Sequence, residues 1–245
     1  MFGEIRNRQG ERLDYTFHEG EKESKNIVVL GHGVTGNKDR PFVVALGEGL
    51  AAAGIPTLRF SFSGNGASAG NFTDSTISKE VEDLGAVLDV LDGYSICYVG
   101  HSVGGAVGVL RASTDSRIQL LVSLAGMVHT QAFAQREFGD VTPDEGFMWD
   151  EPDCPLSHAY MDDLTQIETV VNLAPRITVP WLLVHGDEDD VVPIEDSHDI
   201  LAKSASQAEL VTIEGANHVF SDEYTPVMVE KVIAWIQAQL PNLNP

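Results

Sequence analysis

Short apolar segments alternate with helix-like segments over most of the chain. The apolar segments are short enough and bulky enough to be buried strands, and they span residues 26–30, 57–62, 95–99, 120–124, 181–184 and 210–213. The helix-like segments span residues 42–53, 78–91, 103–112 and 227–240. This alternation predicts an α/β protein, with a mainly parallel central sheet flanked by helices.

Residues 78–91 show the clearest helical periodicity. Their apolar residues fall on one face, and these are Val81, Leu84, Leu88 and Leu91. The acidic residues of the segment fall elsewhere, and these are Glu80, Glu82 and Asp83. Ser78 is the expected N-cap.

Two stretches depart from the alternation. Residues 3–17, with a turn near Gln9-Gly10, predict an antiparallel hairpin at the sheet edge. Residues 125–179 hold four prolines and many carboxylates, and are too long for an ordinary connection. We therefore expect a single domain over residues 1–245, with a cap inserted at about 127–178 and short helices near 131–138 and 161–172.

A Gly-x-Ser-x-Gly motif stands at the end of the strand at 95–99, where it reads Gly100-His101-Ser102-Val103-Gly104. A serine on a sharp turn between a strand and a helix projects its hydroxyl above the sheet, and the flanking glycines let the backbones pass closely. Ser102 is the candidate nucleophile.

A serine hydroxyl needs a neighbouring base, and the base needs a carboxylate to hold its tautomer. His218 follows the last predicted strand and is the candidate base. Four acids follow the strand at 181–184, and they are Asp187, Glu188, Asp189 and Asp190. An acyl-transfer intermediate also needs donors for its oxyanion. We expect the backbone N–H groups of Val103, after the nucleophile, and of Val34, in the loop after an early strand.

These motifs resemble the α/β-hydrolase superfamily, and within it the bacterial cinnamoyl (feruloyl) esterases and serine-aminopeptidase-like esterases. The resemblance rests on Gly31-His32-Gly33-Val34-Thr35-Gly36-Asn37-Lys38, Leu58-Arg59-Phe60-Ser61-Phe62-Ser63-Gly64-Asn65-Gly66-Ala67-Ser68, Gly100-His101-Ser102-Val103-Gly104-Gly105, the acid-rich loop at 185–193 and Gly215-Ala216-Asn217-His218.

The resemblance implies which acid completes the triad. Asp189 stands where the His-Gly-x-x-Asp-x-x-Val-Pro pattern of these enzymes has its acid, with Asp187 and Asp190 as the remaining candidates. The chain order Ser102, Asp189, His218 is that of the α/β-hydrolases.

The resemblance further implies an α/β-hydrolase fold and two-step hydrolysis of an ester through an acyl-enzyme, without a cofactor. Related cinnamoyl esterases often carry Phe at the position of Val34, so an aliphatic wall weakens the case for an aromatic acyl group. The insertion is expected to supply the substrate pocket. Its aromatic residues are as consistent with the core of the cap as with the pocket, and they are Phe133, Phe138, Phe147, Trp149 and Tyr160.

Other chemistries find little support in the motifs. The chain has no His-Glu-x-x-His and no paired Cys motif, so we expect no metal site. Gly64-Asn65-Gly66 lacks the third glycine of a dinucleotide fingerprint. A peptidase, a thioesterase or a carbon–carbon bond hydrolase uses the same triad. A ligand-binding module without catalysis is the alternative from another class, although its triad would be expected to be broken.

The charge balance excludes some partners. The chain holds 37 acidic and 15 basic residues, for a net charge of −22. Nucleic acid and anionic membranes are repelled by such a surface, and strongly anionic substrates are disfavoured.

The N-terminal residues lack the apolar core of a secretory signal, which favours a cytoplasmic location. The two cysteines do not suggest a disulfide framework. A homodimer is compatible with the sequence, which leaves the oligomeric state open.

Overall fold

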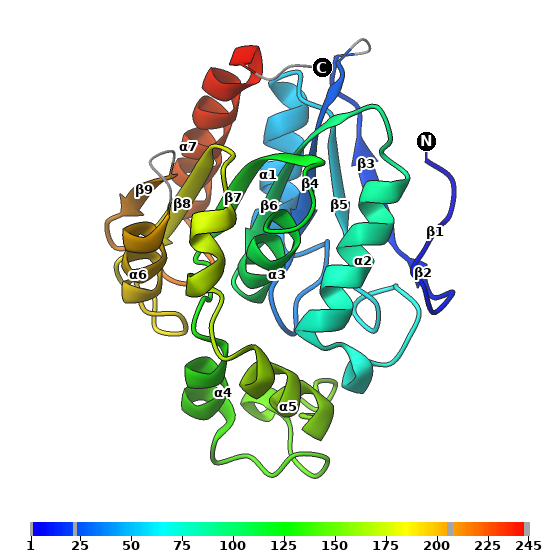
Figure 1. Cartoon of the computed structure of the whole chain (residues 1–245), viewed down its shortest axis with the longest axis vertical. Helices are drawn as coiled ribbons and strands as arrows, with labels where there is room; N and C mark the ends of the chain where they lie inside the picture. Colours follow the sequence, from blue (N-terminus) through cyan, green and yellow to red (C-terminus); the bar gives the residue numbers. More distant parts are fainter. Residues whose placement is uncertain (1, 22–23, 205–207, 243–245) are drawn as a thin grey trace.

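A seven-stranded sheet forms the centre of the computed structural model, which describes residues 2–21, 24–204 and 208–242 (Figure 1). The strand order is β3-β5-β4-β6-β7-β8-β9. The strands are β3 (Tyr15–His18), β4 (Asn26–Gly31), β5 (Thr57–Phe60), β6 (Ser95–His101), β7 (Ile118–Leu124), β8 (Trp181–Gly186) and β9 (Ala208–Ile213). Only the pairing of β3 with β5 is antiparallel among these strands, so the predicted mainly parallel sheet is confirmed.

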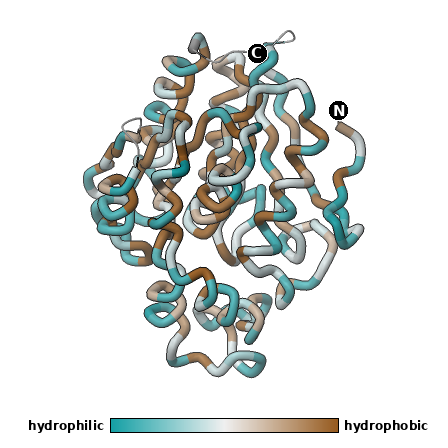
Figure 2. Tube along the Cα trace, in the orientation of Figure 1, coloured by the Kyte–Doolittle hydropathy of each residue, from teal (hydrophilic) through white to brown (hydrophobic). Residues whose placement is uncertain are grey.

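Helices cover both faces of this sheet, which explains why its central strands are continuous apolar runs. Alternate strand residues feed two separate apolar cores: Ile27 and Val29 of β4 face one, and Val28 and Leu30 face the other. The first core lies under α2 (Ile77–Asp89), α3 (Val103–Ala112) and α6 (Glu195–Lys203). The second lies under α1 (Pro41–Ala52) and α7 (Tyr224–Gln239). Figure 2 shows these apolar residues concentrated around the sheet.

The N-terminal segment differs from the predicted hairpin. The short strands β1 (Ile5–Arg6) and β2 (Arg12–Leu13) pair with each other in a separate ribbon, and only β3 joins the edge of the large sheet. The division falls at Asp14, whose backbone N–H donates to Ser68 Oγ (2.8 Å) and whose carbonyl accepts from the Ser61 N–H (2.9 Å). These bonds to the loop after β5 take Asp14 out of the ribbon.

The N-cap of α2 is Thr76, not Ser78 as predicted. The Thr76 hydroxyl accepts from the backbone N–H of Lys79 (3.2 Å). Ser78 lies inside the helix, where its hydroxyl donates to Asp163 at 2.5 Å. Asp163 belongs to the insertion between β7 and β8, so the serine ties α2 to that insertion.

Two acidic residues of α2 are buried although the periodicity places them outside the apolar face: Glu80 is 4 % exposed and Asp83 is 0 % exposed. Asp83 accepts hydrogen bonds from the backbone N–H of Ser63 (2.7 Å) and from the Asn7 side chain (2.8 Å). Glu80 accepts one from the Ser75 hydroxyl (3.3 Å). Burial raises the pKa of both carboxyl groups. Partners distant in the sequence thus compensate the buried Asp83 carboxylate, whereas Glu80 is bonded by the nearby Ser75 and its Oε2 has no hydrogen-bond partner among the described residues.

The insertion between β7 and β8 contains α4 (Thr130–Phe138), a 3₁₀ turn η2 (Met148–Asp150), α5 (His158–Ile167) and a 3₁₀ segment η3 (Val171–Arg176). Figure 1 shows α4 and α5 together, away from the sheet. The helix predicted near 131–138 is confirmed, whereas that predicted near 161–172 is wrong in its bounds. Ser157 caps α5 by accepting from the Tyr160 N–H (3.1 Å), so the helix begins early, and it ends before Glu168, where φ turns positive.

Two further 3₁₀ turns complete the described elements, η1 (Phe72–Asp74) and η4 (Leu240–Asn242). None of the helices in the described part of the chain combines the length and hydrophobicity that a membrane crossing requires.

Candidate active site

Ser102 lies at the sharp turn between β6 and α3. Its φ of 54° and ψ of −120° are unusual for a residue with a side chain, and such strain is typical of functional turns. Gly104 allows the turn because a Cβ there would stand 2.6 Å from the carbonyl oxygen of His32. Gly33 packs directly on the serine, since a Cβ there would stand 2.8 Å from Ser102 Cβ. The predicted strand, turn and helix around the motif are therefore present.

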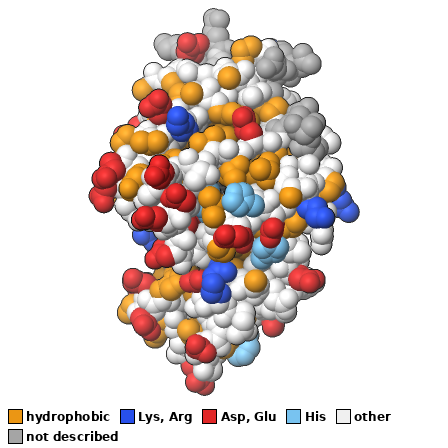
Figure 3. Space-filling model, turned by 90° about the vertical axis from the view of Figure 1, so that its left-hand side faces the viewer, with side chains coloured by type: hydrophobic (Ala, Val, Ile, Leu, Met, Phe, Trp, Pro, Cys, Tyr) orange, Lys and Arg blue, Asp and Glu red, His pale blue; other side chains and the backbone are white. Residues whose placement is uncertain are grey.

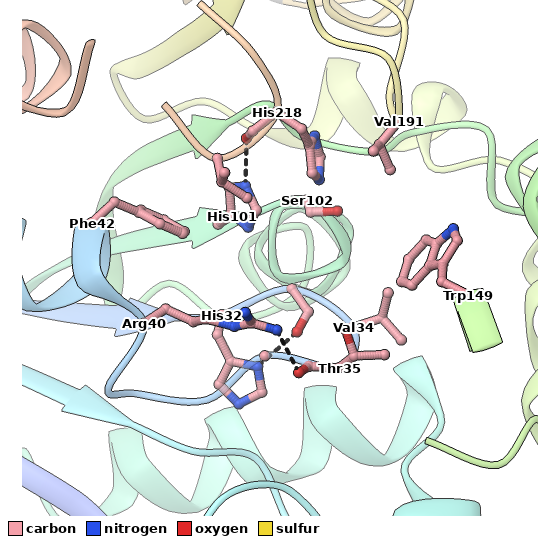
Figure 4. A pocket seen from close by; sticks show the side chains of 13 residues that line it. His32, Val34, Thr35, Arg40, Phe42, His101, Ser102, Trp149, Val191 and His218 are labelled. Carbon is pink, nitrogen blue, oxygen red and sulfur yellow. Dashed lines mark hydrogen bonds between the residues drawn. The ribbon is translucent and has the colours of Figure 1, made fainter. Parts of the chain in front are cut away.

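His218 and Asp189 are brought together from two separate loops. His218 Nδ1 and Asp189 Oδ2 are 2.8 Å apart, and the Asp189 side chain is fully buried. Because Nδ1 is engaged by the carboxylate, the other ring nitrogen of His218 is the one left to act as a base. Figure 4 shows the imidazole beside Ser102, and both residues border one pocket.

The loop after β8 distinguishes Asp189 from its acidic neighbours. Asp189 Oδ1 accepts from the backbone N–H groups of Val191 (2.9 Å) and Val192 (2.8 Å). Burial would raise the pKa of Asp189, but hydrogen bonds with His185 and His218 outweigh it and hold the pKa well below its usual range. Asp187 instead accepts from the Gly215 N–H (2.6 Å) and is exposed, as is Asp190. Of the three aspartates, Asp189 is therefore the one in contact with His218.

His101 supports the loop that carries His218, a role that sequence reasoning missed. Burial and the neighbouring His218 lower the pKa of His101 to about 3, so its ring is neutral. His101 Nε2 lies 2.9 Å from the backbone carbonyl of His218, to which it donates. The His101 ring lies between the rings of Phe42 and His218 in tilted contacts, with both centroid distances 4.7 Å. The one sequence signal for this role was the position of His101 inside the Gly-x-Ser-x-Gly motif, directly before Ser102.

The two expected oxyanion donors flank Ser102. Val103 is the first residue of α3, where backbone N–H groups lack partners within the helix. Val34 borders the pocket on the opposite loop. His32 braces that loop, because its Nε2 accepts from the Phe62 N–H (3.1 Å) and its Nδ1 donates to the Gly33 carbonyl (2.8 Å). Burial lowers the pKa of His32 to about 4, which keeps it neutral.

A cavity of about 250 Å³ lies over Ser102. Sequence reasoning had not assigned several of its lining residues, which are Thr35, Arg40, Phe42, Trp149, Val191 and Val219. Trp149 comes from the insertion and is 40 % exposed, whereas Phe133, Phe138 and Tyr160 are buried in the core. Only the structure separates these two groups of aromatic residues. Within the described ranges no cluster of three or more His, Cys, Asp or Glu side chains is placed to hold a metal ion.

The sheet, the strand-end loops and the serine turn define a hydrolase of the α/β-hydrolase fold. The chain belongs to the prolyl oligopeptidase family, whose model matches residues 72–242.

Solved structures and curated proteins agree with this assignment. Est1E from Butyrivibrio proteoclasticus, solved with bound ferulic acid, is 28 % identical with a TM-score of 0.86, over 97 % of this chain and 99 % of that one. Mouse alpha/beta hydrolase domain-containing protein 10 shares the fold, with a TM-score of 0.80 at 19 % identity over 99 % of both chains. A monoacylglycerol lipase of Mycolicibacterium smegmatis is 23 % identical over 94 % of this chain and 95 % of its own length. The predicted superfamily resemblance is confirmed, and the chain is an esterase- or lipase-like hydrolase.

Proposed function

We propose that this protein is a serine carboxylesterase that hydrolyses small to medium carboxylic esters through Ser102, His218 and Asp189. The observation that carries the proposal is the 2.8 Å bond between His218 Nδ1 and buried Asp189, next to a strained Ser102 that shares a pocket with His218. A histidine held in one tautomer beside a serine is the arrangement that activates the hydroxyl.

In the first step, Ser102 Oγ attacks the ester carbonyl while His218 Nε2 takes its proton. The backbone N–H groups of Val34 and Val103 stabilise the oxyanion. The carbon–oxygen bond to the alcohol then breaks, and the imidazolium returns the proton to the leaving oxygen. In the second step, His218 takes a proton from water, the resulting hydroxide attacks the acyl-enzyme, and the acid leaves with Ser102 reprotonated. Asp189 stabilises the imidazolium in both steps, and no cofactor takes part.

Two features bear on the acyl group. The likeness to a structure that holds ferulic acid supports hydroxycinnamate esters among the substrates. The small aliphatic side chain of Val34 beside Ser102 favours aliphatic acyl groups of moderate length. In this proposal residues 127–178 act as a cap, and Trp149 of the cap forms one wall of the substrate pocket.

The decisive experiment is hydrolysis of p-nitrophenyl esters from acetate to decanoate, together with methyl ferulate, by the wild type and by Ser102→Ala. We expect turnover by the wild type and a loss of about 10⁵-fold or more in kcat for the variant, because the triad acts as a unit. His218→Ala should lose nearly as much. Circular dichroism must show both variants folded. Equal turnover by Ser102→Ala would refute the mechanism.

The family's description favours one second candidate, a peptidase that uses the same residues. A prolyl p-nitroanilide added to the substrate panel separates the two functions. Faster cleavage of this amide than of the best ester would replace the esterase with a peptidase and leave the triad intact.

A further inference from the structure

Arg40 lines the same cavity as the proposed nucleophile, Ser102. It follows the loop that carries Val34 and directly precedes α1, and its side chain is exposed. One guanidinium nitrogen donates to the backbone carbonyl of Thr35 at 3.0 Å, which leaves the other N–H groups free to bind a ligand. Figure 4 shows this side chain reaching into the pocket near His32 and Thr35.

Arg40 has no acidic partner among the described residues, although acids outnumber bases more than twofold in this chain. The adjacent carboxylate, Asp39, turns away to Arg59 (2.5 Å) and Lys38 (2.9 Å). An arginine left unpaired in such an acidic protein is available to an anion from outside.

The charge of the cavity differs in sign from the charge of the chain. Within the described part of the chain, no Asp or Glu lines the cavity over Ser102, and Arg40 is its one charged side chain apart from the histidines. His32 and His101 are neutral, because burial lowers their pKa values to about 4 and about 3. Acidic side chains are spread over the outer surface, as Figure 3 shows for one face. A small anion is therefore attracted locally by Arg40 once it has entered the cavity.

A second cavity of about 260 Å³ adjoins the first and shares three of its lining residues, Arg40, Phe42 and Val219. It continues toward Ser221 and Thr225, with Asp222 as its acidic member. Arg40 thus stands between the serine and additional space that a substituent of the ester can occupy. Elsewhere in the catalytic cavity, an apolar wall is formed by Val34, Trp149 and Val191.

We propose that Arg40 binds a carboxylate carried by the ester, so that the preferred substrates are monoanionic esters with one apolar part and one carboxylate-bearing part. The planar guanidinium fork matches a carboxylate. A phosphate dianion is a poorer fit, because a single arginine faces it within a protein of net charge −22. The net charge alone disfavours anionic substrates, and Arg40 reverses that preference for one carboxylate. This inference rests on the proposed esterase function.

Two pairs of matched esters test the proposal. One pair carries the charge on the acyl part: 4-nitrophenyl hydrogen glutarate against its glutaramate, in which an amide replaces the carboxylate. The other carries it on the leaving group: 4-acetoxybenzoate against 4-acetoxybenzamide. The kcat/KM ratio of anionic to neutral ester is measured for the wild type, Arg40→Gln, Arg40→Lys and Arg176→Gln. Comparison between variants cancels the intrinsic reactivity difference within each pair.

Arg176→Gln is the matched control. Arg176 also lacks an acidic partner among the described residues, it lies in η3 away from both cavities, and its replacement changes the net charge equally. We expect Arg40→Gln to lower the ratio about tenfold in at least one pair, as for loss of a charge-assisted hydrogen bond. Arg40→Lys should retain part of the preference for the anionic ester, and Arg176→Gln should retain all of it. In the wild type, 1 M salt should weaken this preference.

Ratios for Arg40→Gln within twofold of the wild type in both pairs would overturn the proposal, as would an equal fall for Arg176→Gln. Calorimetry measures the binding of glutarate and glutaramate without turnover. It is carried out on Ser102→Ala and on the double variant Ser102→Ala, Arg40→Gln. Tighter binding of glutarate that disappears with Arg40→Gln supports the carboxylate site even if no ester is hydrolysed. Arg40-dependent binding of glutarate without any ester hydrolysis would refute the esterase function but not the carboxylate site. Equal binding of glutarate and glutaramate would refute the carboxylate site.

Discussion

Two regions of the molecule form the candidate active site, the loops at the strand ends and the insertion between β7 and β8, and they hold their residues in different ways. Ser102, Asp189 and His218 follow β6, β8 and β9, whose hydrogen-bonded register fixes where each loop begins. Trp149 sits in a short 3₁₀ turn, 40 % exposed, held by the Phe138 ring (5.0 Å between centroids) and by a bond to Glu137 (3.1 Å).

In the proposed function, the strand-end loops carry out the chemistry and the insertion selects the acyl group. Proton transfer requires that the reacting atoms be placed to within a few tenths of an ångström. Loops that start at the buried carboxyl ends of the strands can hold atoms that precisely. A wall that selects an acyl group needs only shape and apolar surface, so a loosely packed turn is sufficient. The two regions are nevertheless joined. Arg136 of α4 donates to the Val191 carbonyl (2.6 Å) in the loop of Asp189, and Asp196 accepts from the Val128 N–H (2.8 Å).

The largest expected effect tests the strand-end loops. Asp189→Asn should lower kcat for p-nitrophenyl acetate by about 10⁴-fold, because the amide no longer holds His218 in its tautomer or stabilises its cation. Asp187→Asn should lower kcat by less than about tenfold, since Asp187 bonds only the Gly215 N–H at an exposed position. Unchanged far-ultraviolet circular dichroism controls for folding. The reverse order of effects would assign the acid to Asp187.

A smaller effect is expected from the insertion. Trp149→Ala should raise KM for longer acyl esters about fivefold with kcat nearly unchanged, for a loss of about 1 kcal/mol of apolar contact. The acetate ester should be little affected, because its acyl group is too small to reach the turn.

The control for Trp149 is Phe147→Ala. Phe147 is equally exposed (41 %) and two residues away, but it does not border the cavity. Equal changes for the two variants would mean that the insertion contributes general stability and no selectivity.

The contrast between the strand-end loops and the insertion also explains which parts of the site can be predicted from the sequence. The central strands are recognisable because they are apolar on both faces. Ser102 and His218 become candidates because each follows a predicted strand, whereas the choice of Asp189 among four acids rests on the family resemblance. The burial of Asp83 carries no such signal, because its partners Asn7 and Ser63 lie 76 and 20 residues away in the sequence. Trp149 and Arg40 carry no periodic signal. Their places on the cavity wall depend on how loops from different parts of the chain meet.

The smallest effect tests how α2 is joined to the insertion. Thr76→Ala should lower the free energy of unfolding by about 1 kcal/mol, because it removes the N-cap bond to the Lys79 N–H. Ser78→Ala should cost under about 0.5 kcal/mol, since its bond to Asp163 of the insertion is exposed. Urea denaturation of both variants measures the difference. A larger cost for Ser78→Ala would show that α2 is stabilised more by the insertion than by its own cap, and kcat should be unchanged in either case.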